Sequence, residues 1–132
     1  MEKVSAGFRS YLAPVLFLAA IFFQNFISRI ILAPLLPSIE KDLGLSHGQA
    51  GSFFFLMTAG YFFAMLGSGF FSARYTHRRT IVIAIASVGI SLLLIALSRD
   101  LWSMRAALLL LGMSAGLYLP SGIATLTQLV DP

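Results

Sequence analysis

The sequence predicts an all-α membrane protein with four transmembrane helices. Of its 132 residues, 58% are hydrophobic and only 11% are charged, against roughly 25% charged in an ordinary soluble domain. The mean hydropathy of +0.90 leaves too little polar surface to cover a globule in water. Four long apolar runs follow one another along the chain. Each can cross a bilayer as a helix, which takes about 20 residues.

Helices are favoured over a membrane β-barrel because the apolar runs are continuous. A barrel strand uses about 9–11 residues, of which alternate ones are apolar, and these runs are much longer and do not alternate. An unpaired strand would also leave its backbone polar groups unsatisfied in lipid. The predicted spans are 11–36, 49–72, 80–98 and 106–130.

Short polar segments connect the spans and carry most of the charge. The first apolar run is too long for a cleaved secretory signal, so we expect it to be retained. The Lys and Arg residues number five on one side of the membrane and three on the other, and the richer side should be cytoplasmic. The expected layout is a cytoplasmic N-terminus 1–10, an outer loop 37–48, a cytoplasmic loop 73–79, an outer loop 99–105 and a cytoplasmic end 131–132.

We therefore expect a multi-pass protein of the cell membrane (plasma or inner) with both termini in the cytoplasm. The net charge of +4 lies mostly in loops, so the bilayer is the expected partner and nucleic acid is not. The chain has no Cys and no catalytic constellation such as a Ser/His/Asp set. We expect no enzyme activity, cofactor or metal.

A polar stripe in the first span is the strongest candidate for function. Arg29 is the one charge clearly inside a span, and Asn25 lies one turn before it beside Gln24. An arginine at a helix centre costs about 2.5–3.5 kcal/mol on insertion scales. Arg29 could instead extend to the outer headgroups, but Asn25 and Gln24 lie deeper. We therefore favour a cavity that binds a substrate.

Small residues in two other spans indicate helix packing. Residues spaced four apart let helix backbones approach closely in lipid, and a proline in the fourth span predicts a kink. The residues concerned are Gly60, Ala64, Ser68, Gly112, Gly116 and Pro120.

The loop after the second span resembles the cytoplasmic signature of the major facilitator superfamily, G-x-x-x-D-R-x-G-R-R. Gly69, Arg74 and Arg78 fall in register with that signature. The sequence departs from it at Ala73, Thr76 and His77. Segments resembling the N-terminal half of the family surround the loop, in order: Ala33 to Pro37, Asp42 to Ser46, Gly60-Tyr61 and Gly112 to Pro120.

The resemblance covers about residues 11–130 and implies a secondary transporter that works by alternating access. It implies that a small solute binds at Arg29, Asn25 and Gln24, with Tyr118 and Pro120 on the opposite wall. In members that carry organic anions or phosphate esters, an Arg lies in the first helix eight residues before a Pro, as Arg29 precedes Pro37. The implied gating loop comprises Gly69, Arg74, Arg78 and Arg79.

By the same resemblance, the chain supplies the first four of twelve helices. We expect it to be truncated or a partial sequence, with the remaining helices as its partners, and not to be active alone. One alternative is a complete four-helix protein that works as an oligomer, such as a small multidrug exporter. Exporters of that type depend on an acidic residue in the first span, and here the nearest is Glu40, in the loop. The other alternative is a fragment that folds but does not transport.

Overall fold

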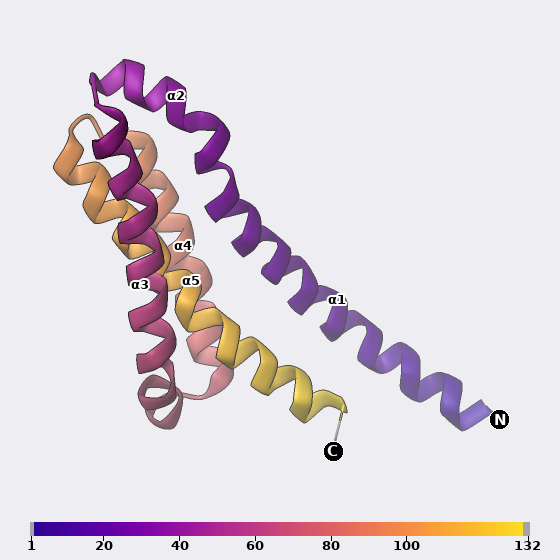
Figure 1. The fold of residues 1–132 in the computed structure, drawn as a ribbon. Coiled ribbons are helices and arrows are strands. Elements are labelled where there is room, and N and C mark those ends of the chain that lie inside the picture. Colours follow the sequence, from indigo (N-terminus) through magenta and orange to yellow (C-terminus); the bar gives the residue numbers. More distant parts are fainter. Residues whose placement is uncertain (1, 131–132) are drawn as a thin grey trace.

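The computed structural model describes residues 2–130, which are entirely helical apart from short connections (Figure 1). Met1 and the expected cytoplasmic end 131–132 lie outside the described residues. The helices are α1 (Glu2–Ile30), α2 (Leu32–Leu43), α3 (His47–Arg74), α4 (His77–Leu97) and α5 (Leu101–Val130). Four segments are long and apolar enough to cross a membrane: Tyr11–Leu43, His47–Phe71, His77–Leu97 and Leu101–Gln128. The all-helical fold with four candidate spans confirms the predicted fold class, while the direction in which the chain crosses the membrane stays a prediction.

The first span is interrupted at Ile31, where α1 ends and α2 begins. Pro34 has no N–H to donate to the carbonyl of Ile30, and its ring crowds that carbonyl. The interruption is shallow, because the Ile31 N–H still donates to Ile27 at 2.9 Å and the backbone stays in the right-handed helical region. The chain bends here, so that α2 leans over the end of α3 (Figure 1).

The helices extend into the segments that we expected to be loops. Helix α2 continues through Pro37 to Leu43, so the first part of the expected outer loop 37–48 is helical. Only Tyr75 and Thr76 separate α3 from α4. Polar residues can occupy the ends of membrane helices that reach the headgroups, so hydropathy locates the apolar core of a helix better than its ends.

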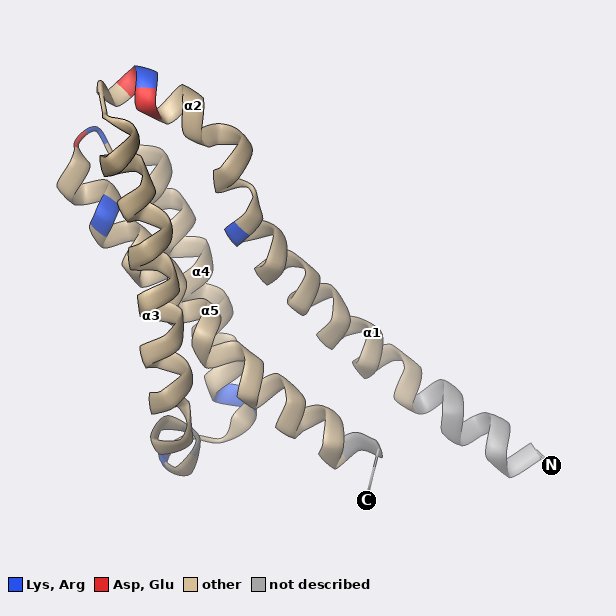
Figure 2. Ribbon diagram, viewed as in Figure 1, with Lys and Arg blue, Asp and Glu red and all other residues tan. Residues whose placement is uncertain are grey.

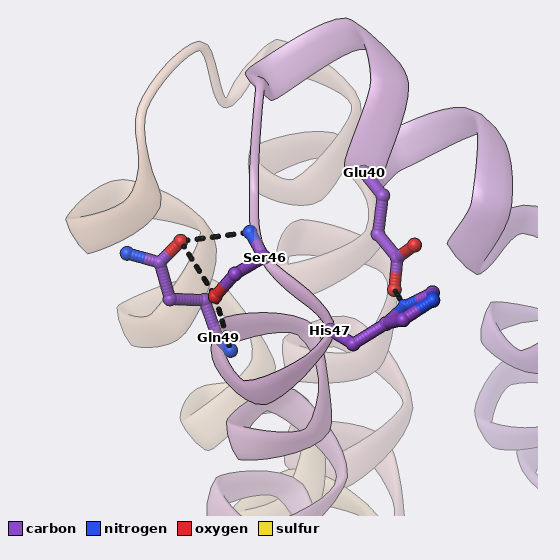
Figure 3. Close-up of polar contacts among 4 residues, drawn as sticks. All are labelled: Glu40, Ser46, His47 and Gln49. Atoms are coloured by element: carbon purple, nitrogen blue, oxygen red, sulfur yellow. Dashed lines mark hydrogen bonds and ion pairs between the residues drawn. The ribbon is translucent and has the colours of Figure 1, made fainter.

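A tight turn joins α2 to α3. Gly44 has φ +62°, the left-handed region that glycine enters without a steric penalty, and its N–H donates to the carbonyl of Glu40. Ser46 and Gln49 then form a reciprocal cap: the Gln49 N–H donates to Ser46 Oγ at 3.3 Å, and the Ser46 N–H donates to Gln49 Oε1 at 3.0 Å (Figure 3). His47 Nδ1 lies 2.9 Å from Glu40 Oε1 across the same turn, an ion pair whenever the imidazole is protonated (Figure 3).

Asp100 begins α5. Its carboxylate accepts hydrogen bonds from the backbone N–H groups of Ser103 at 3.0 Å and Trp102 at 3.1 Å, and from the Ser103 hydroxyl at 2.8 Å. The bonds from Ser103, followed by that from Trp102, hold the pKa of Asp100 below its usual value. The turn 98–100 is thereby fixed at the end of the bundle where α2 meets α3.

Helix α5 is the centre of the fold. In the most apolar 18-residue stretch of α5, 56% of the residues are buried, against 22–28% in the corresponding stretches of the other three spans. It packs against α3 on one side and α4 on the other, over a cluster formed by Leu32, Phe53, Met57, Val88, Met104, Leu108 and Leu111. Helix α1 diverges from this group towards its N-terminus (Figure 1).

Three glycines allow α3 and α5 to touch through their backbones. A Cβ atom added at Gly60 would lie 2.6 Å from the carbonyl oxygen of Leu109. Cβ atoms at Gly112 and Gly116 would collide with the carbonyl oxygens of Met57 and Tyr61 respectively. Ala64 lies against Gly116, and Ser68 is buried one turn further on, where its hydroxyl donates to Met65 O at 2.7 Å.

We predict that Gly112→Ala lowers the free energy of unfolding by about 1–3 kcal/mol, because the new methyl group must push α3 away from α5. Gly89→Ala on α4 is the matched control, since no atom lies within 4 Å of its added Cβ. The measurement is an SDS titration in mixed micelles, followed by circular dichroism. Equal stability of the two variants would contradict the close approach.

Candidate functional site

Arg29 lies in the last turn of α1, just before the interruption at Ile31. Its guanidinium carbon is 4.7 Å from the centroid of the Tyr61 ring on α3. Such a cation–π contact contributes about 0.5–1 kcal/mol when exposed and about 2 kcal/mol when desolvated. The Nε atom of Arg29 is buried and has no hydrogen-bond partner among the described residues. Arg29 is thus oriented by an aromatic ring and keeps hydrogen-bonding capacity unused.

A groove of about 330 Å³ opens beside this pair, between the first span and α3. Tyr61 and Thr58 supply its neutral polar groups, and Arg29 supplies its charge. The remaining walls are apolar. The α1–α3 groove is lined by Phe26, Arg29, Ile30, Ala33, Phe54, Met57, Thr58 and Tyr61.

Asn25 and Gln24, the other residues of the polar stripe, lie one turn deeper than Arg29. Asn25 is 6% exposed, whereas Gln24 is exposed. Ser28, which directly precedes Arg29, is also 6% exposed. The Ser28 hydroxyl donates to the Gln24 carbonyl at 2.8 Å, so its hydrogen bond is made within α1. Neither Asn25 nor Gln24 lines the groove beside Arg29. The structure places the Arg29 guanidinium against Tyr61 and leaves Asn25 and Gln24 out of the groove lining.

Tyr118 lies elsewhere. It is 3% exposed, and its hydroxyl donates to the carbonyl of Leu18 on α1 at 2.7 Å. It lines a separate, almost wholly apolar cavity of about 400 Å³ between α1 and α5. Tyr118 therefore holds α1 against α5 and does not share a cavity with Arg29.

Helix α5 continues through Pro120, which cannot donate to the carbonyl of Gly116. The buried hydroxyl oxygen of Ser121, the next residue, has no partner among the described residues. Gly122 lies against Tyr118, since an added Cβ would be 3.2 Å from the Tyr118 ring. This part of α5 lacks one backbone hydrogen bond and lies beside the hydrogen bond from Tyr118 to α1.

The basic residues of the expected gating loop are exposed at the α3–α4 turn. Arg74 is the last residue of α3, and Arg78 and Arg79 lie in the first turn of α4. Gly69 is exposed on α3, and no atom lies within 4 Å of an added Cβ there. Figure 2 shows the charged residues gathered mainly at the two ends of the helices, as expected for segments that cross a bilayer.

Arg105, which we placed in the outer loop 99–105, lies on α5. Its Nε and Nη2 atoms donate to the Ser52 hydroxyl oxygen at 3.2 and 3.1 Å, and its guanidinium carbon lies 5.3 Å from the Trp102 ring centroid. Arg105 therefore links the N-terminal parts of α5 and α3. Within the described residues there is no group of three or more His, Asp or Glu side chains that could hold a metal ion.

Sequence reasoning missed Tyr61 as a neighbour of Arg29. The two residues lie on successive spans, so no spacing within one helix connects them. The available signal was a phenol in the middle of an apolar run, since a tyrosine at that depth needs a polar or cationic neighbour.

Comparison with known families decides the identity of the chain. The sequence model of the Major Facilitator Superfamily matches residues 18–132. The chain belongs to the major facilitator superfamily. No match was found among curated proteins or among solved structures. This match confirms the predicted family. With four candidate spans, this major facilitator protein is, in general terms, a multi-pass membrane transporter.

We predict that Tyr118→Phe lowers the free energy of unfolding by about 0.5–1.5 kcal/mol, because it removes the hydrogen bond between α5 and the Leu18 carbonyl. Tyr11→Phe is the control, since Tyr11 is 44% exposed. The same SDS titration measures both variants. A Tyr118→Phe protein as stable as the control would show that the bond contributes nothing to the attachment of α1.

Proposed function

We propose that this protein moves a small organic anion across the cell membrane by alternating access, as part of a secondary transporter of the superfamily. The observation that carries the proposal is the position of Arg29 in a span, with its guanidinium on Tyr61 and a groove beside it. An arginine at such depth is costly and usually has a ligand, a partner or a water-filled cavity.

The described residues offer Arg29 no carboxylate within ion-pair distance. Its charge is balanced only in part by the negative face of the Tyr61 ring. An anionic solute would supply the missing negative charge and accept the unused hydrogen bonds. This electrostatic argument favours an anion over a cation as the transported solute.

Alternating access in this superfamily needs two halves that rock about a site between them. In our proposal α1 and α5 line the substrate route, with Asn25 and Gln24 below Arg29. The exposed cluster of Gly69, Arg74, Arg78 and Arg79 acts as the cytoplasmic gating loop. Tyr118 supports the route by holding α1 to α5, a positioning role that its hydrogen bond to Leu18 favours.

Substitution of Arg29 tests the proposal. In a transporter that includes this segment together with the remaining helices of the fold, Arg29→Ala should lower anion uptake by roughly tenfold to a hundredfold, since it removes hydrogen bonds to a charged ligand. Arg99→Ala, at an exposed connection between α4 and α5, is the charge-matched control. Initial uptake rates into proteoliposomes provide the measurement. Equal losses in the two variants would show that Arg29 does not bind the solute.

We also predict that the purified 132-residue chain shows no saturable flux in liposomes. Four helices cannot form both halves that alternating access requires. Counterflow of a labelled organic anion, with empty liposomes as the control, measures this. Saturable flux would favour the alternative of a four-helix protein that works as an oligomer, and crosslinking to a symmetric dimer would support that alternative further.

A further inference from the structure

The walls of the α1–α3 groove differ sharply in polarity. Arg29 provides the positive charge at one side, and Phe54, Met57 and Ile30 provide apolar surface around it. Its volume of about 330 Å³ lies within the size range of small-molecule sites. A ligand that fills the groove must therefore present a charged end and an apolar body.

The Tyr61 ring lies against the Arg29 guanidinium, whose carbon is 4.7 Å from the ring centroid, and both residues line the groove. A carboxylate can accept two parallel N–H bonds in the plane of a guanidinium. The Nε–H has no acceptor among the described residues. Together with one Nη–H, this unused Nε–H would offer a carboxylate such a pair of bonds.

Charge counting limits the ligand to a single negative charge. Among the residues that the structure describes, those lining the groove include one cation and no carboxylate. A monoanion neutralises Arg29, whereas the second charge of a phosphate ester would be left against apolar walls, where an unpaired charge is costly.

The backbone of Tyr61 is held by the packing of α3 and α5. Gly116 of α5 lies directly against the carbonyl oxygen of Tyr61, and Gly112 lies against that of Met57, one turn earlier. These contacts fix the backbone of α3 near Tyr61. Tyr61 is thereby a rigid support for the guanidinium, which reduces the ordering cost of binding.

We propose that the α1–α3 groove binds an amphipathic monocarboxylate, with its carboxylate on the edge of Arg29 and its apolar body against Phe54 and Met57. Tyr61 is a positioning residue for this site, because its ring holds the Arg29 guanidinium through a cation–π contact. This inference rests on the proposed anion transport and narrows its substrate class.

The test uses the 132-residue chain in lipid nanodiscs and fluorine NMR of four probes. Para-fluorobenzoate is the expected ligand, fluoroacetate lacks the apolar body, para-fluorophenyl phosphate carries a second charge and para-fluorobenzyl alcohol carries none. Binding is read from line broadening after subtraction of empty nanodiscs. We expect para-fluorobenzoate to bind most tightly of the four. The comparison needs no variant, so it remains decisive whichever substitutions fold.

Variants then separate the roles of the two residues. Arg29→Ala should abolish binding of para-fluorobenzoate, and Tyr61→Leu should weaken it roughly threefold to thirtyfold by removing the cation–π support. Tyr61→Phe keeps the ring and should bind within about threefold of the original chain. Arg99→Ala and Tyr11→Leu, both at exposed positions, should bind as the original chain does. Circular dichroism and elution from a sizing column verify folding.

Each other outcome overturns a specific part of the account. Tightest binding of fluoroacetate or of the phosphate would overturn the substrate class but leave an anion site at Arg29. No effect of Tyr61→Leu would overturn the positioning role of Tyr61. Binding of anions that is unaffected by Arg29→Ala would overturn both this inference and the proposed function. Binding of none of the four probes would overturn the inference alone, because anion uptake by the larger transporter is measured separately.

Discussion

The backbone contact between α3 and α5 is the constraint on which the other features depend. In a bilayer, apolar side chains gain little free energy by exchanging contact with lipid for contact with a neighbouring helix. Close van der Waals packing must therefore hold the helices together. Gly60, Gly112 and Gly116 remove the side chains that would keep the two backbones apart. The result is a paired core of α3 and α5, against which α4 packs and from which α1 diverges (Figure 1).

The candidate site lies where this core meets the first span. Gly116 supports the backbone of Tyr61, and the ring of Tyr61 supports Arg29. The Tyr118 hydroxyl fixes α1 at a second level, while the interruption at Ile31 lets α2 turn over α3. Tyr61 on α3 therefore contacts the charged side chain of Arg29 within the first span, and a groove remains beside the pair. Packing and electrostatics act here on the same residues.

The sequence was sufficient for the fold class, the family and the number of spans, because hydropathy and length follow directly from the requirements of a bilayer. It indicated that Gly112 and Gly116 would lie on a packing face, but a small-residue pattern does not identify the helix that packs on it. Helix ends were less predictable, since Leu43 and Leu101 lie within segments expected to be loops.

The pairing of Arg29 with Tyr61 and the hydrogen bond from Tyr118 to Leu18 were beyond local patterns. Both contacts join residues on different helices, and helical periodicity specifies neighbours only within one helix. The sequence identified Arg29 as unusual because a charge in an apolar run is costly. It could not indicate that an aromatic ring, rather than Asn25, would lie against the guanidinium.

The central claim is that Arg29 faces a water-accessible groove rather than lipid. The chain has no Cys, so single cysteines can be labelled with a membrane-impermeant thiol reagent in proteoliposomes. Thr58→Cys, in the groove beside Arg29, should react, and Leu93→Cys, 65% exposed on α4, should remain unlabelled because it faces lipid. If Thr58→Cys is as unreactive as Leu93→Cys, the groove is not open to water and the account of Arg29 as a binding residue is contradicted.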